Sequence, residues 1–171
     1  MKNKSWNQYF FEMCDLVASK SKDPSTKVGA VIVGEDNEIR STGFNGFSRH
    51  VDETIPERWE RPIKYQFVSH AERNAIYNAA RIGVSLKGCT LYMNFEPCPC
   101  TGCANAVIQS GIEKIVGPAI PFPGKGEQWE NDMKISKVML DEAGVERIEI
   151  EDEWVIQKRV ASNWNKRNKP T

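Results

Sequence analysis

A histidine, a glutamate and a group of cysteines form the most chemically suggestive pattern in the sequence. His70 and Glu72 stand two positions apart, and residues 97–103 read PCPCTGC, which contains Cys98, Cys100 and Cys103. Zinc in proteins is held mainly by histidine nitrogen and cysteine thiolate, and a catalytic zinc keeps three protein ligands and one position for water. His70, Cys100 and Cys103 would supply these three ligands, so the sequence predicts a catalytic Zn²⁺ site.

The spacing of the cysteines leaves one alternative open. Cys100 and Cys103 lie three positions apart, which at the first turn of a helix places both sulfurs on the same side. Free backbone N–H groups at such a helix start also favour the thiolate form. Cys98 is the alternative to Cys100, since Cys98 and Cys103 form a wider C-x4-C pair. Cys98 as a fourth ligand would instead make the site purely structural.

Glu72 is expected in the first turn of a helix that begins after His70. From that position it cannot readily become a metal ligand without distorting the turn, but it can reach water on the metal. The order H-x-E followed by P-C-x-x-C is the signature of zinc-dependent nucleobase deaminases, in which the glutamate transfers protons. We therefore predict that Glu72 is the catalytic acid and base.

The elements that must position these residues alternate between strands and helices. Trp6, Phe10, Met13 and Val17 recur at helical spacing after a capping Ser5. The hydrophobic pattern then predicts strands over 27–33, 38–42, 89–95, 112–116 and 145–150, and helices over 71–81, 101–109, 128–142 and 154–164. GFNG (43–46) is expected to be a loop, and 47–66 is expected to be irregular. This order predicts an α/β sandwich, in which two helix starts meet over one metal.

The composition limits the function classes. The chain has 171 residues and equal numbers of basic and acidic side chains, 23 of each. A neutral total argues against a nucleic-acid partner, which usually requires a basic excess. No apolar run is long enough to span a membrane, and the N-terminus does not read as a signal peptide. We expect a cytoplasmic protein whose thiols stay reduced.

Longer segments resemble the zinc-dependent cytidine and deoxycytidylate deaminase superfamily over roughly residues 20–150. The superfamily shares the motifs HAE (70–72) and PCTGC (99–103). Other segments are similar to its deoxycytidylate deaminases, namely SKDPSTKVGAVIV (21–33), GFNG (43–46), RPIKYQFVSHAERNAI (61–76) and IQSGIEKIV (108–116).

This resemblance implies a three-layer α-β-α sandwich with a mixed five-stranded sheet. It also implies a single domain over 1–171, with a core at about 20–150 and a C-terminal extension at 151–171. The implied reaction is the hydrolysis of dCMP to dUMP and ammonia, which supplies dUMP for thymidylate synthesis. Zinc would lower the pKa of its bound water, and Glu72 would pass the water proton to N3. Hydroxide would attack C4, and Glu72 would then protonate the departing amine.

The resemblance also implies substrate contacts. Asn45 and Ala71 are the expected substrate-binding residues, although an asparagine beside glycine also suits a plain turn with positive φ. Ser25 and Lys27 lie near the loop that contacts the nucleotide in this family. Tyr92 and Phe122 could stack on a base, and Tyr92 could equally be a core strand residue.

Phosphate recognition is less specific in the sequence. The stretch between GFNG and His70 contains the cations Arg49, His50, Arg58, Arg61 and Lys64. Arg49 and Lys64 are the candidate phosphate contacts among them, because a dianionic phosphate requires several donors. The alternative is that these cations pair with nearby acidic residues.

Relatives of this type are commonly homohexamers that dCTP activates and dTTP inhibits, with Mg²⁺ accompanying the triphosphate. The resemblance alone implies these properties. Two alternatives differ in function: a deaminase of tRNA adenosine, free cytosine, guanine or a modified dCMP such as 5-methyl-dCMP, and a non-catalytic zinc protein that binds nucleotide. The neutral charge argues against tRNA, and Glu72 argues against a binding protein.

Overall fold

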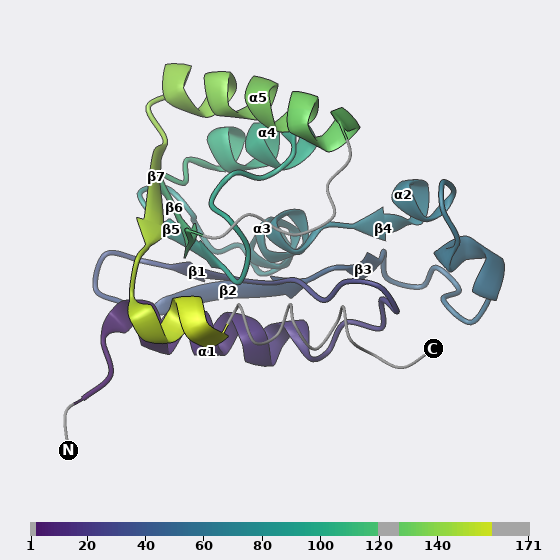
Figure 1. Ribbon diagram of the computed structural model, residues 1–171, viewed down its shortest axis with the longest axis horizontal. Coiled ribbons are helices and arrows are strands. Elements are labelled where there is room, and N and C mark those ends of the chain that lie inside the picture. Colours follow the sequence, from purple (N-terminus) through teal and green to yellow (C-terminus); the bar gives the residue numbers. More distant parts are fainter. Residues whose placement is uncertain (1–2, 120–126, 159–171) are drawn as a thin grey trace.

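The computed structural model describes residues 3–119 and 127–158. Its described strands are β1 (Gly29–Val33), β2 (Ile39–Phe44), β3 (Gly46–Phe47), β4 (Val68–Ser69), β5 (Thr90–Met93), β6 (Lys114–Pro118) and β7 (Glu146–Ile150). A five-stranded sheet has the order β2-β1-β5-β6-β7 (Figure 1). β1 is antiparallel to β2 and β5, whereas β5, β6 and β7 are parallel. The predicted mixed five-stranded sheet is confirmed.

Helices cover both faces of this sheet. The helices α3 (Ala71–Ile82), α4 (Thr101–Ser110) and α5 (Glu127–Glu142) lie on one face, and α1 (Trp6–Ala18) lies on the other with the helical residues 153–158 (Figure 1). Alternate strand residues feed the two interfaces. Ile32 and Met93 pack in the core beneath α3 and α4, whereas Val31 and Val33 pack against α1. The three-layer α-β-α sandwich is therefore confirmed.

Local signals in the sequence set the helix ends. The Ser5 hydroxyl accepts a hydrogen bond from Gln8 N at the start of α1, at 3.1 Å, as predicted. α3 ends at Gly83 and α4 ends at Gly111, both in the left-handed conformation that glycine adopts without strain. His70 and Cys100 occupy the N-cap positions of α3 and α4, and neither side chain caps its own helix. Both side chains are thus free for another partner.

The stretch predicted to be irregular contains short ordered elements. β3 pairs with β4, and a 3₁₀ turn (Pro56–Trp59) and α2 (Lys64–Phe67) lie between them. Stacked aromatic rings hold the segment together: the Phe47 centroid lies 4.2 Å from that of Trp59 and 5.4 Å from that of Phe67. Elements this short carry no periodicity, so the sequence pattern did not predict them.

The prediction that GFNG is a loop is wrong, because β2 continues to Phe44 and β3 begins at Gly46. Gly43 explains why this strand carries glycine. A Cβ atom there would lie 2.2 Å from the backbone nitrogen of Ala75 and 2.4 Å from the carbonyl oxygen of Ala71. Glycine therefore allows the first turns of α3 to pack directly on β2, which fixes the position of His70 and Glu72.

The C-terminal helix and the absence of a membrane span can be compared with the structure only over the described residues. The C-terminal helix is seen over 153–158, and the rest of the predicted helix lies outside the described residues. No helix in the ranges 3–119 and 127–158 is long and apolar enough to cross a membrane.

Candidate metal centre and active site

The starts of α3 and α4 bring three metal-binding side chains together. The Nδ1 atom of His70 lies 3.3 Å from the Cys100 Sγ and 3.4 Å from the Cys103 Sγ. All three donor atoms lie within 4.8 Å of one another. A tetrahedral zinc with ordinary bond lengths would hold nitrogen and sulfur about 3.6 Å apart. The predicted set His70, Cys100 and Cys103 therefore has the spacing of one zinc site.

Cys98 points to a different partner. Its sulfur lies 3.6 Å from the carbonyl oxygen of Met133 on α5, and it is not part of the His70 group. Burial raises the pKa of the Cys98 thiol. By contrast, the Cys103 thiol and the His70 ring lower the pKa of Cys100 to about 4. A metal binds the thiolate, so the geometry and the charge both favour Cys100 over Cys98.

Glu72 lies beside this cluster in the first turn of α3. Its side chain is buried, and burial raises the pKa of its carboxyl group while the His70 ring opposes that rise. A carboxyl group with a raised pKa can both accept and release a proton near neutral pH. The position and environment of Glu72 are therefore those of a proton carrier.

A pocket opens onto the cluster, and both predicted substrate contacts lie in it. His70, Glu72 and Cys100 line the pocket together with Asn45 and Ala71. The Asn45 Oδ1 accepts a hydrogen bond from Val28 N, and its amide donates to Asp23 Oδ2 and Thr26 O. Both amide hydrogens are thus used, and one lone pair of Oδ1 remains. The alternative of a positive-φ turn is wrong, because the non-glycine residues with positive φ in the described ranges are Asn37 and His50.

The predicted phosphate contacts separate in space. Lys64 lines the pocket, but its ammonium donates to Asp23 and to the Ser25 hydroxyl. Arg49 donates to the Asn78 side chain at 2.5 Å, and neither Arg49 nor the exposed Lys27 lines the pocket. Lys64 is therefore paired with an acid, but with the distant Asp23 and not with an acidic residue of its own stretch, which was the alternative considered from the sequence.

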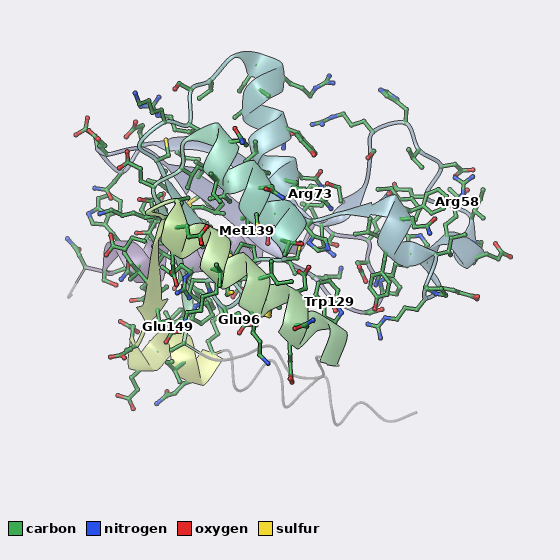
Figure 2. The ribbon with its side chains drawn as sticks, turned by 90° about the horizontal axis from the view of Figure 1, so that it is seen from above. Arg58, Arg73, Glu96, Trp129, Met139 and Glu149 are labelled. Carbon is green, nitrogen blue, oxygen red and sulfur yellow. The ribbon has the colours of Figure 1, made fainter. Side chains whose placement is uncertain are left out.

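Sequence reasoning missed the pocket aromatics. Trp129, at the N-terminal end of α5 (Figure 2), has its ring centroid 6.1 Å from that of His70 and 6.0 Å from that of Tyr65. The expectation that Tyr92 stacks on a base is wrong. Its ring packs 4.8 Å from Phe10 on the α1 side of the sheet, as its alternative assignment to the core predicts. Phe122 lies outside the described residues.

A family comparison agrees with this geometry. The sequence model of the cytidine and deoxycytidylate deaminase zinc-binding region matches residues 4–118. The chain belongs to this deaminase family. The match includes His70, Glu72, Cys100 and Cys103, so the family's zinc-binding region and the cluster coincide.

Individual relatives support the same membership in the deaminase family. An uncharacterized deaminase of Aliivibrio fischeri, from the luxG 3′ region, is 43% identical over 141 residues, which cover 82% of this chain and 90% of the relative. Deoxycytidylate deaminase of Pongo abelii is 34% identical over 147 residues, covering 82% and 76%. The crystal structure of dCMP deaminase from cyanophage S-TIM5 with dCMP and dUMP has a TM-score of 0.68 at 22% identity, covering 88% and 100%. It shares the fold.

The donor set of this deaminase chain fits zinc. One imidazole nitrogen and two sulfurs suit a borderline-soft ion, and the lowered pKa of Cys100 favours the thiolate that zinc requires. Burial raises the pKa of Glu72, and the hydrogen bond with Cys100 together with burial raises the pKa of Cys103; the positive charge of Arg73 beside the cluster partly opposes both rises. Figure 2 shows Arg73 between α3 and α4. Its place directly after HAE was the sequence signal for it.

α5 is fastened to the metal-binding helix. The Asp132 carboxylate accepts hydrogen bonds from Thr101 N at 2.9 Å and from the Thr101 hydroxyl at 2.7 Å. Asp132 therefore caps α4 from a neighbouring helix, next to Cys100. Since Trp129 lies one turn earlier on α5, the same contact fixes the aromatic wall of the pocket.

Proposed function

We propose that this protein is a zinc-dependent deaminase that hydrolyses dCMP to dUMP and ammonia. One observation carries the proposal: the buried Glu72 lies beside His70, Cys100 and Cys103 at a pocket of a chain in the deaminase family. The named deoxycytidylate deaminase of Pongo abelii, with 82% of this chain aligned, supports the choice of substrate.

In this proposal His70, Cys100 and Cys103 would hold zinc. When bound there, zinc acts as a Lewis acid and lowers the pKa of its bound water to near neutral pH. Glu72 accepts the proton of the attacking water and donates it to N3 of the cytosine ring. As the water oxygen bonds to C4, Glu72 takes the remaining proton of that oxygen and carries it to the amine, so that the C4–N bond breaks, C4=O forms and ammonia leaves.

Asn45 and Ala71 would orient the base and sugar. The free lone pair of Asn45 Oδ1 can accept from a hydroxyl or amino group of the substrate. Ala71 is the first residue of α3, where backbone N–H groups have no partner within the helix. Its N–H can therefore donate to the carbonyl oxygen of cytosine. Trp129 and Tyr65 would exclude water from one side of the base.

Further parts of the proposal concern regulation and location. The family resemblance supports a homohexamer that responds to dCTP and dTTP, with Mg²⁺ accompanying the triphosphate. We also place the protein in the cytoplasm. All five cysteines are free thiols, and a reducing compartment keeps thiols available for metal.

The test is a substrate panel with zinc-loaded protein, followed by ammonia release. The substrates are dCMP, 5-methyl-dCMP, dCTP, cytidine and cytosine, each with and without dCTP or dTTP as effector. We expect turnover of dCMP among the unmodified substrates, loss of turnover on chelation and its return with added zinc. Bound zinc with no turnover of dCMP would refute the proposal.

The Glu72→Gln variant tests the mechanism in the same assay. Glutamine keeps the size of the side chain but cannot carry a proton, so turnover should fall about 10²–10⁴-fold. Zinc content and dUMP binding should stay at the wild-type level. A near-wild-type rate in this variant would show that Glu72 is not the proton carrier.

A further inference from the structure

The pocket contains a buried ion pair that neutralises the charge of one of its cations. The Lys64 ammonium lies 2.7 Å from Asp23 Oδ1, and the two side chains are only 7% and 2% exposed. Ser25 Oγ takes a second hydrogen bond from the ammonium at 3.1 Å. These two contacts use two of the three N–H donors of the ammonium, and Asp23 already compensates its charge inside the pocket.

The same pair has a structural role in the loop that precedes β1. The Asp23 Oδ1 atom accepts hydrogen bonds from Ser25 N at 2.8 Å and from Thr26 N at 3.0 Å, and Oδ2 accepts from Asn45 at 3.1 Å. Lys64 therefore connects α2 to this loop and to Asn45. These contacts account for a buried lysine without any ligand.

Arg61 is the remaining cation of arginine or lysine type that lines the pocket within the described residues. Its side chain is exposed, and its guanidinium carbon lies 5.9 Å from the centre of the Tyr65 ring. It forms no ion pair with any residue in 3–119 or 127–158. Among the described residues, its planar donor fork therefore has no acidic partner, and it lies at the pocket.

The neighbouring arginines differ from Arg61 in this respect. Arg58 lies over the Phe67 ring at 4.9 Å and donates to the carbonyl oxygen of Asp52. Figure 2 shows Arg58 in the segment beyond α2, away from Trp129. Arg49 is bonded to Asn78 and does not line the pocket. Arg61 is therefore distinguished by its place in the pocket and by the absence of a hydrogen-bond or ion-pair partner in the part of the chain that the structure describes.

We propose that Arg61 binds the 5′-phosphate of the nucleotide and makes the enzyme select nucleoside monophosphates over nucleosides. This inference rests on the proposed function. Guanidinium binds phosphate oxygens through two parallel hydrogen bonds. The Tyr65 ring supports the guanidinium plane at the pocket mouth, while the base reaches Glu72 inside. Lys64 maintains the loop, and its charge is already compensated by Asp23.

The experiment compares Arg61→Gln, Arg61→Lys and the matched control Arg58→Gln as zinc-loaded proteins. The measured quantities are kcat and KM for dCMP and for deoxycytidine, which lacks the phosphate. We expect Arg61→Gln to lower kcat/KM for dCMP about 10- to 100-fold, mainly through KM, and to leave deoxycytidine unchanged. Arg61→Lys should recover part of the loss, and Arg58→Gln should match the wild type.

A second measurement covers the case in which deoxycytidine turnover is too slow to follow. The inhibition constants of dUMP and deoxyuridine against dCMP should lose their difference in Arg61→Gln. Equal losses for nucleotide and nucleoside, or no loss for dCMP, would overturn the inference. So would a changed response to dCTP with unchanged dCMP kinetics, because that would place Arg61 at an effector. If the proposed function itself is wrong, the wild-type protein will not turn over dCMP, and this result is distinct from any effect of the Arg61 variants.

Discussion

The structure predicts that the two residues of the buried Asp23–Lys64 pair differ in how much stability is lost when each is replaced. Asp23→Asn retains an oxygen for Ser25 N, Thr26 N and the Lys64 ammonium, but it removes the negative charge that compensates this buried ammonium. It also places an NH2 donor against the amide of Asn45. Removing one partner of a buried pair costs about 3–5 kcal/mol. Lys64→Met instead leaves a carboxylate that still accepts from Ser25, Thr26 and Asn45. We therefore expect Asp23→Asn to cost more than Lys64→Met.

The double variant should be more stable than the sum of the two losses predicts, because neither charge is then left unpaired. The assay is urea unfolding of all variants at one fixed free zinc concentration, so that metal release contributes equally. Glu53→Gln is the control, because it breaks an exposed ion pair with Lys22. The Lys22 side chain is 67% exposed and that of Glu53 is 36% exposed, so the substitution should lower the free energy of unfolding by under about 1 kcal/mol. If Asp23→Asn costs no more than Glu53→Gln, the reasoning about burial is refuted.

Three other substitutions test the site and its support. Cys98→Ala should keep zinc, whereas Cys100→Ala should lose it to a chelator; equal zinc contents would contradict the geometric choice between them. Gly43→Ala should lower the free energy of unfolding by about 1–3 kcal/mol in urea, because the new methyl group meets the backbone of α3. Asp132→Asn weakens the cap on Thr101, so we expect a loss of about 1 kcal/mol in the same assay and faster zinc loss. If the rate of zinc release is unchanged, Asp132 contributes to helix packing and does not support the metal site.

The chemistry of the site was predictable because its residues act through local structure. His70 and Cys100 each end an extended stretch and begin a helix, and Cys103 follows one turn later. Glycines at the ends of α3 and α4 fix where those helices stop. Each signal lies within a few residues of the side chain that it positions. The sequence therefore predicted the metal set, with Cys98 left open, and the neighbouring Glu72.

The substrate side of the pocket was less predictable because its contacts are distant in the chain. Lys64 and Asp23 lie 41 positions apart, and no local pattern indicates that one neutralises the other. The helical pattern over 128–142 likewise predicted a helix without identifying which face carries Trp129 into the pocket. The short elements between β3 and β4 depend on aromatic packing, which periodicity does not reveal.

The metal cluster and the exposed side of the pocket differ in how readily they tolerate substitution. The metal cluster and Glu72 depend on two helix starts packed against the sheet, where even a methyl group at Gly43 meets backbone atoms. Arg61 and Tyr65 instead have exposed side chains on a short segment that lines the pocket. Under the proposed roles, substitutions there would alter which phosphate or sugar is bound and would leave proton transfer at Glu72 unaffected. In this proposal, the residues that select the substrate are separate from the residues that carry out the reaction. The ratio of kcat/KM for dCMP to kcat/KM for deoxycytidine measures the selection, and kcat for dCMP measures the reaction.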